Sequence, residues 1–309
     1  MRIFISTTSF AEYDKTPLDL LESSGFKVIL NPYKRKLKPE EVVKLARDCD
    51  GIIAGVEQLT EEVFKQLPKL EAVSRCGVGT DNVDLEAARK RGITVSSTPN
   101  APTQSVAELT VGLILNLLRR VNLSDRWVRS GTWSREMGQL LFGKTIGIVG
   151  LGRIGKRVAE LLRPFGVKIL ASEPKPDKKW VEENKVSLTS LEELLRESDI
   201  VTLHIPYTEQ NRNLINAERL KIMKEGAILI NTSRGGLVDE GALYQALKSG
   251  HLSGAALDVM EVEPYRGPLK ELDSVILTPH IGSYALEARV QMEMEATKNL
   301  INMLTGERK

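Results

Sequence analysis

Three glycines with G-x-G-x-x-G spacing, Gly150, Gly152 and Gly155, are the residues whose pattern indicates a definite chemistry. The apolar run 145–149 before them is typical of a buried strand, and the apolar residues after them have helical spacing. In that context Gly150 permits a tight turn, Gly152 lets a pyrophosphate approach the backbone, and Gly155 lets helix and strand pack closely. The start of the helix offers free N–H groups and the positive end of its dipole. The pattern predicts a dinucleotide-binding turn.

An acidic residue, Glu173, follows the next expected strand, residues 167–171. A carboxylate at this distance from the glycines can accept hydrogen bonds from an adenosine ribose diol, and it would repel the 2′-phosphate of NADP. Lys175, Lys178 and Lys179 lie just beyond it and are able to hold such a phosphate. The sequence therefore favours NAD and leaves NADP as the alternative.

Polar side chains that could do acid–base or anion-binding chemistry follow the later apolar strands. They are Arg234, Asp258, Glu263 and His280. Open parallel sheets bind ligands at the carboxyl ends of their strands, so these residues are expected near one edge. Taken singly, each has an ordinary interpretation as a surface arginine, a solvated carboxylate or a core histidine. His204, at the end of another strand, lies either near the adenine end of the cofactor or in a satisfied strand-end position.

The first third of the chain, residues 2–98, alternates expected strands and helices, which indicates a parallel sheet with helices on both faces. It contains no phosphate-binding fingerprint, so we do not expect it to hold the cofactor. The glycine-rich loop 74–82 exposes backbone N–H groups that could hold a carboxylate, with Arg75 adding charge. The alternative is a plain strand-to-helix turn ending in an Asp84 cap.

Residues 98–102 contain two prolines and an asparagine, which interrupt helices and strands, and a last helix is expected over 285–304. The chain is expected to pass from one domain to the other at these two places. We expect a substrate domain of residues 1–98 plus 284–309 and a cofactor domain of residues 99–283. The fold class is α/β, with two doubly wound parallel sheets: a flavodoxin-like substrate domain and a Rossmann NAD-binding domain. The apolar segment 103–142, with Trp127 and Trp133, predicts a homodimer interface, the alternative being intramolecular packing.

The composition excludes several classes of partner. The 43 Lys and Arg residues nearly balance 41 Asp and Glu residues, giving a net charge of +2, so we expect no nucleic-acid partner. The start resembles no signal peptide and no apolar run is long enough to span a bilayer, so we expect a cytoplasmic protein without membrane association. Cys49 and Cys76 do not have C-x-x-C spacing, and we expect no metal site.

Several motifs occur together in a known order: the loop 75–82, the fingerprint, Asn-Thr-Ser-Arg-Gly at 231–235, Ala-Leu-Asp-Val at 256–259, and Thr-Pro-His-Ile-Gly at 278–282. With these motifs nearly the whole chain resembles the D-isomer-specific 2-hydroxyacid dehydrogenases. It most resembles a short D-3-phosphoglycerate dehydrogenase without the regulatory domain. The resemblance implies hydride transfer between NAD(H) and a small D-2-hydroxy acid or its 2-oxo acid.

The resemblance also implies roles for single residues. His280 would be the base, Glu263 would hold its imidazole, and Arg234 would bind the substrate carboxylate and the C2 oxygen. Such chemistry needs a group that titrates near neutrality and a planar donor fork. The implied substrate contacts are Arg75, Val78, Gly79 and Arg234. The implied cofactor contacts are Gly150, Gly152, Arg153, Ile154, Gly155, Glu173, His204, Pro206, Thr232, Ser233, Asp258, Gly282 and Ser283.

The substrate is the least determined expectation. The resemblance favours 3-phosphoglycerate and 3-phosphohydroxypyruvate, a pair for which Arg75 offers a phosphate contact. However, phosphoglycerate dehydrogenases usually have a second arginine where this chain has Gly55, and Glu57 would repel a phosphate. A glyoxylate or hydroxypyruvate reductase is therefore the alternative. A second alternative is a non-catalytic NAD-sensing protein of the same fold.

Overall fold

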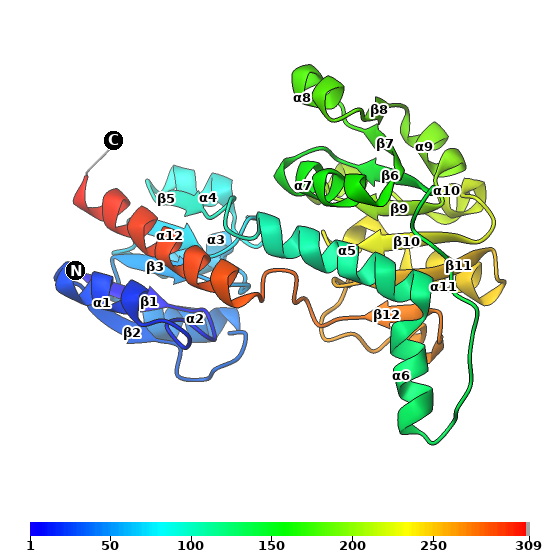
Figure 1. Cartoon of the computed structure of the whole chain (residues 1–309). Helices are drawn as coiled ribbons and strands as arrows, with labels where there is room; N and C mark the ends of the chain where they lie inside the picture. The colour runs from blue at the N-terminus through cyan, green and yellow to red at the C-terminus, as the bar shows by residue number, and fades with distance from the viewer. Residues whose placement is uncertain (307–309) are drawn as a thin grey trace. The chain divides into compact units, whose positions relative to one another are not determined.

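The computed structural model describes residues 1–306, which separate into two compact units (Figure 1). Unit 1 consists of Met1–Pro102 and Ser283–Lys309, and unit 2 is Thr103–Gly282. Each unit is a parallel sheet covered by helices on both faces, and each is considered by itself below. No helix within residues 1–306 combines the length and apolar character needed to cross a membrane.

Unit 1 contains a five-stranded parallel sheet in the order β2-β1-β3-β4-β5. This is the flavodoxin-like order expected from the sequence. Its strands are β1 (Arg2–Ile5), β2 (Lys27–Leu30), β3 (Gly51–Ala54), β4 (Ala72–Arg75) and β5 (Thr94–Ser97). Its helices are α1 (Thr16–Ser23), α2 (Pro39–Ala46), α3 (Glu61–Lys65), α4 (Leu85–Lys90) and α12 (Leu286–Thr305).

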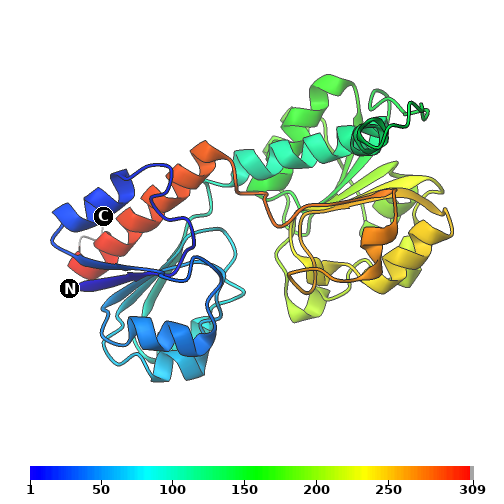
Figure 2. The same ribbon diagram turned by 90° about the horizontal axis from the view of Figure 1, so that it is seen from below.

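Side chains of the unit 1 strands alternate between two apolar clusters because successive residues of a strand point to opposite faces. Ile3 and Ile5 of β1 pack with Leu300 of α12, whereas Phe4 packs with Phe64 of α3 on the other face. Figure 2 shows the red α12 and the dark blue α1 on one side of this sheet. The burial of each such side chain stabilises the fold by about 1.5–3 kcal/mol. This explains why the last helix belongs to unit 1.

Unit 2 contains a seven-stranded parallel sheet in the order β12-β11-β10-β9-β6-β7-β8. The order reverses between β9 and β6, as in a Rossmann fold. Its strands are β6 (Thr145–Val149), β7 (Lys168–Ser172), β8 (Ser187–Leu188), β9 (Ile200–Leu203), β10 (Ala227–Asn231), β11 (Leu252–Leu257) and β12 (Val275–Leu277). Its α-helices are α5 (Thr103–Arg119), α6 (Val121–Arg129), α7 (Arg153–Leu162), α8 (Lys178–Glu183), α9 (Leu191–Glu197), α10 (Ala217–Ile222) and α11 (Glu240–Lys248). The α/β class with two doubly wound sheets is confirmed.

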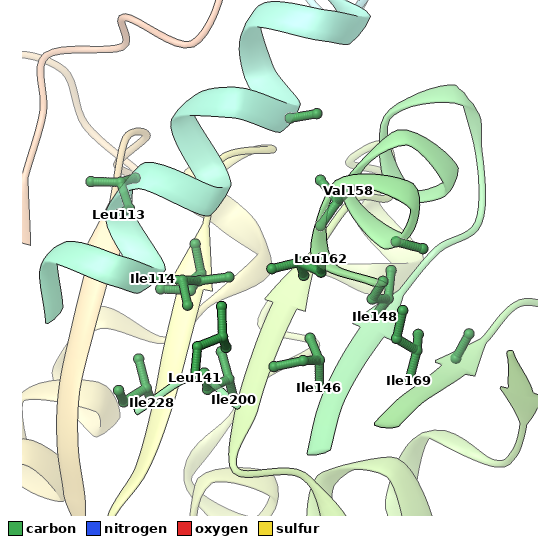
Figure 3. Close-up of a cluster of buried hydrophobic side chains, with 14 of the residues drawn as sticks. Leu113, Ile114, Leu141, Ile146, Ile148, Val158, Leu162, Ile169, Ile200 and Ile228 are labelled. Carbon is green, nitrogen blue, oxygen red and sulfur yellow. The ribbon is translucent and has the colours of Figure 1, made fainter. Parts of the chain in front are cut away.

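Unit 2 has two apolar clusters, and one of them lies between its sheet and the helix pair α5 and α7. Figure 3 shows this cluster, with Leu113 and Ile114 on α5, Val158 on α7 and Ile146 on β6. All four side chains are buried. These α5 side chains are therefore covered within unit 2, whereas Leu109, Val111 and Leu115 of the same helix are only partly buried.

Several helices begin with a side-chain cap, among them the Asp84 cap considered from the sequence. The carboxylates of Asp84 and Asp239 cap α4 and α11 by accepting the backbone N–H of the residue three positions on, and the Ser190 hydroxyl caps α9 in the same way. Thr60 precedes α3, but its side chain makes no cap hydrogen bond. The short helix α6 was not predicted, and Leu123 is its buried side chain.

Candidate active site

The glycine turn connects β6 to α7 with the expected backbone geometry. Gly150 has φ +96°, a conformation that side chains other than glycine rarely adopt. A Cβ added to Gly155 would lie 2.0 Å from the Gly150 carbonyl oxygen, so only glycine allows this approach. A Cβ added to Gly152 would meet no atom within 4 Å, so the space before α7 is open. The first-turn N–H groups, including those of Arg153 and Ile154, fit a pyrophosphate there.

Glu173 is held beside this turn by two backbone hydrogen bonds. Its Oε2 accepts from the Leu151 N–H at 3.0 Å, and its Oε1 accepts from the Lys175 N–H at 3.0 Å. The carboxylate therefore lies next to the glycine loop with acceptor capacity left for a ribose diol. Its negative charge disfavours a 2′-phosphate at the same place, so this end of unit 2 fits NAD.

The end of β9 packs under the glycine turn. A Cβ on Gly150 would lie 2.6 Å from the carbonyl oxygen of His204. The His204 ring has its Nε2 2.9 Å from Thr202 Oγ1, which satisfies one ring nitrogen within the strand. Burial lowers the pKa of His204 to about 3, so the ring is neutral at physiological pH. Pro206, further along, is exposed.

Arg234 follows β10 on a loop that Asn231 organises. The Asn231 side chain donates to the Arg234 carbonyl oxygen at 2.8 Å and accepts from the Ser233 N–H at 3.0 Å. The Arg234 Nη1 donates to the Ser233 carbonyl oxygen at 2.7 Å. Thr232 is anchored to α5, with its hydroxyl 3.0 Å from the Thr110 hydroxyl. Asn231 belongs to the motif 231–235, but no role was predicted for it, although an asparagine ending an apolar strand is a signal for such a turn.

Asp258 organises the loop that carries His280. Its buried carboxylate accepts hydrogen bonds from the Thr278 hydroxyl (2.6 Å), the Ile281 N–H (2.8 Å) and the Gly282 N–H (2.8 Å). The His280 N–H also donates to the Asp258 carbonyl oxygen at 2.9 Å, and His280 has φ +57°. Three of about four acceptor positions on the carboxylate are used within the protein, which leaves one for a ligand.

His280 and Glu263 form the expected pair. The imidazole Nδ1 lies 3.2 Å and 3.1 Å from the two Glu263 carboxylate oxygens, and the Met260 N–H donates to Oε1 at 3.2 Å. The two side chains are 39% and 41% exposed, so the pair adds little to stability. The pair instead fixes the tautomer of the His280 ring. The Glu263 carboxylate keeps a proton on Nδ1, which leaves Nε2 for proton exchange with a bound molecule.

The glycine-rich loop of unit 1 is compact. Gly77 has φ +142°, and a Cβ built on it would lie 1.2 Å from Nη1 of Arg75, so the guanidinium lies directly over this glycine. The Gly77 N–H donates to the Thr98 hydroxyl at 2.7 Å. Val78 is exposed on the same loop. Burial raises the pKa of Cys76 to about 11, so this residue is a buried thiol.

The comparisons with known proteins agree with this geometry. A family model described as "D-isomer specific 2-hydroxyacid dehydrogenase, NAD binding domain" matches residues 111–282. A glyoxylate reductase from Pyrococcus horikoshii is 41% identical over 307 residues, which cover 96% of this chain and 92% of that protein. The chain belongs to the D-isomer-specific 2-hydroxyacid dehydrogenases.

Two further relatives are informative about the range of this family. A D-3-phosphoglycerate dehydrogenase from Methanocaldococcus jannaschii is 40% identical over 276 residues, covering 88% of this chain and 53% of that protein. The crystal structure of D-lactate dehydrogenase from Aquifex aeolicus, complexed with NAD and lactic acid, superposes with a TM-score of 0.86 at 32% identity, covering 99% and 96% of the two chains. This 2-hydroxyacid dehydrogenase is thus an NAD-dependent enzyme, as the resemblance implied.

The structure of this 2-hydroxyacid dehydrogenase brings most of the predicted site residues together in unit 2. The loops of Arg234, Asp258 and His280 follow the neighbouring strands β10, β11 and β12. Ser283, also predicted to contact the cofactor, is the first residue of the second part of unit 1. Within residues 1–306, no group of three or more His, Cys, Asp or Glu side chains is arranged to hold a metal ion.

Proposed function

We propose that the protein reduces short, unphosphorylated 2-oxo acids with NADH, with glyoxylate and hydroxypyruvate as its substrates. The pair formed by His280 and Glu263 carries the proposal for the reaction, because it presents one ring nitrogen for proton transfer. The similarity to a glyoxylate reductase over nearly the whole chain supports the choice of substrate.

NADH, when bound, supplies the hydride that C2 of the 2-oxo acid accepts. The Arg234 guanidinium binds the substrate carboxylate through its planar donor fork and stabilises negative charge that develops on the C2 oxygen. Protonated His280 donates the proton from Nε2 to that oxygen. Glu263 keeps the other ring nitrogen protonated and stabilises the imidazolium. In the reverse reaction neutral His280 removes the hydroxyl proton.

A phosphorylated substrate is the second candidate, supported by the similarity to the archaeal D-3-phosphoglycerate dehydrogenase. Two residues after β3 disfavour it: Gly55 has no side chain to bind a phosphate, and Glu57 adds a carboxylate. This reverses the order that the sequence resemblance favoured.

The test measures kcat/KM with NADH for glyoxylate, hydroxypyruvate and phosphohydroxypyruvate. We expect hydroxypyruvate to exceed phosphohydroxypyruvate by about tenfold, equivalent to about 1.4 kcal/mol. A preference for the phosphorylated acid would identify a phosphoglycerate dehydrogenase instead. Tight NADH binding without turnover of any acid would identify a non-catalytic binder.

We also propose that the protein is a homodimer, with residues 121–142 as the interface. Trp133, Met137, Leu140 and Phe142 are 82%, 92%, 69% and 74% exposed, which is unusual for a run of large apolar side chains. An isologous contact with a second copy would cover them. Light scattering of the parent and of a Met137→Lys, Leu140→Lys variant tests this: the parent should be a dimer and the variant a monomer. A monomeric parent at micromolar concentration would contradict it.

A further inference from the structure

The loop between β11 and β12 carries Glu263, and the first part of this loop packs against the Arg234 loop. A Cβ added to Gly235 would lie 1.9 Å from the Met260 carbonyl carbon and 2.2 Å from the Glu261 nitrogen. The peptide between Met260 and Glu261 therefore lies directly on the residue that follows Arg234. The Met260 N–H donates to the Glu263 carboxylate at 3.2 Å. The same stretch of backbone thus connects the Arg234 loop to the carboxylate of Glu263.

This stretch of backbone is held by Glu240, the first residue of α11. The Glu240 Oε1 accepts a hydrogen bond from the Glu261 N–H at 2.7 Å. The start of α11 itself is capped by Asp239, whose carboxylate accepts from the Ala242 N–H at 2.9 Å. The Glu240 carboxylate therefore serves the neighbouring loop, whereas the Asp239 carboxylate serves the helix.

A second link to Glu261 is weaker. Arg212 Nη2 lies 2.8 Å from Glu261 Oε1, but the two side chains are 55% and 44% exposed, so this ion pair contributes little. Glu240 and Glu261 also line a cavity of about 320 Å³. A water molecule there can accept the Glu261 N–H when Glu240 is shortened, but it cannot fix the loop to α11. Loss of the Glu240 side chain should therefore change the position of the loop more than the stability of the unit.

We propose that Glu240 is a positioning residue for proton transfer, which fixes the loop that carries Glu263 and so keeps its carboxylate aligned with His280. The inference rests on the proposed function, in which Glu263 keeps the imidazole in one tautomer. Reacting groups act at full rate only in a narrow range of geometries, and a shift of about 1 Å is costly. Glu240 therefore affects the rate through Glu263, without contacting substrate or cofactor.

The alternative is that Glu240 only stabilises α11, because an acidic residue in the first turn interacts favourably with the helix dipole. Glu240→Gln separates the two roles. Its amide oxygen can still accept from the Glu261 N–H, but the negative charge is lost. If the hydrogen bond to the loop matters, Glu240→Gln retains the activity that Glu240→Ala loses. If the charge matters, both variants lose it alike.

A matched control is available at Glu192, in the first turn of α9. The start of α9 is capped by Ser190, as the start of α11 is capped by Asp239. The Glu192 carboxylate accepts from Arg219 of α10 at 2.8 Å, a partner outside the loop that carries Glu263. Glu192→Ala therefore reports the effect of removing a first-turn acid from a capped helix of the same unit.

The experiment measures kcat and KM with NADH and hydroxypyruvate in the parent, Glu240→Ala, Glu240→Gln, Glu192→Ala, Glu263→Ala and the double variant Glu240→Ala, Glu263→Ala. We expect Glu240→Ala to lower kcat by about fivefold with KM for NADH unchanged. Glu240→Gln and Glu192→Ala should retain most of the parent kcat. In the Glu263→Ala background, Glu240→Ala should change kcat by less than about twofold, because the side chain that Glu240 positions is already absent.

Equal losses of kcat in Glu240→Ala and Glu240→Gln would assign the effect to the helix dipole and overturn the proposal. Independent losses that multiply in the double variant would also overturn it, because Glu240 would then act separately from Glu263. If Glu240→Ala does not fold, Glu240→Asp replaces it in the same cycle, since it keeps the charge but shortens the side chain. A parent that prefers the phosphorylated acid would contradict the proposed function alone, because the same coupling can be measured with that acid.

Discussion

His204 provides a quantitative test, because its neutral ring should make the protein less stable in acid. Its folded pKa of about 3 is far below the 6.5 of an ordinary histidine. Above pH 6.5 the ring is neutral in both the folded and the unfolded chain, so it contributes no pH dependence. Between pH 6.5 and 3 the unfolded chain binds a proton that the folded chain excludes, and the free energy of unfolding falls as the pH falls.

The expected loss follows from the size of the pKa difference. Each pH unit below 6.5 costs about 1.4 kcal/mol, so at pH 5 the loss from His204 is about 2 kcal/mol. The side chain is partly exposed, which makes this an upper value. In a unit of this size the loss corresponds to a Tm lower by about 4–8 °C.

The assay compares urea unfolding at pH 8 and pH 5 for the parent and His204→Gln, whose side chain is neutral at both pH values. The variant should lose less stability than the parent between the two conditions, by about 2 kcal/mol. His251→Gln is the control, since it keeps His204 and removes a ring that lies 3.1 Å from the Leu220 carbonyl oxygen. Equal losses in the parent and His204→Gln would refute the argument that the buried ring excludes the proton.

Three further predictions concern the site in unit 2. Glu173→Ala should narrow the preference in kcat/KM for NADH over NADPH, because it removes both a ribose acceptor and a repulsive charge; a parent without any preference would contradict this. Glu263→Gln should lower kcat for both reduction and oxidation, because a neutral amide stabilises the charged imidazole of His280 less than a carboxylate does; an unchanged kcat would exclude Glu263 from its role. Gly235→Ala should lower the free energy of unfolding, measured in urea, by about 1–3 kcal/mol, because the new Cβ would lie 1.9 Å from the Met260 carbonyl carbon. The control is Gly112→Ala, whose Cβ would meet no atom within 4 Å and which should cause no such loss.

Much of this architecture is encoded locally and was therefore predictable. The apolar run 145–149, the glycine spacing at 150–155 and the cap at Asp84 each depend on neighbouring residues, whose preferences act over a few positions. Parallel strands end at the same edge of a sheet. The order of elements was therefore enough to predict that the loops of Arg234 and His280 lie near each other. The roles of these residues in catalysis stay predictions.

Other features were decided by contacts between distant residues, which no local pattern encodes. Asp258 accepts its three hydrogen bonds from residues 20 to 24 positions later, so its function as the organiser of the His280 loop appears only in the folded chain. Part of the apolar face of α5 is covered within unit 2, although its composition equally fits a subunit interface. Glu57 looks like a surface acid in the sequence, yet donors from Ser6, 51 positions away, and from Gly55 allow its burial. Whether a polar side chain is buried depends on whether the tertiary structure supplies its partners, because an unpaired buried charge is too costly.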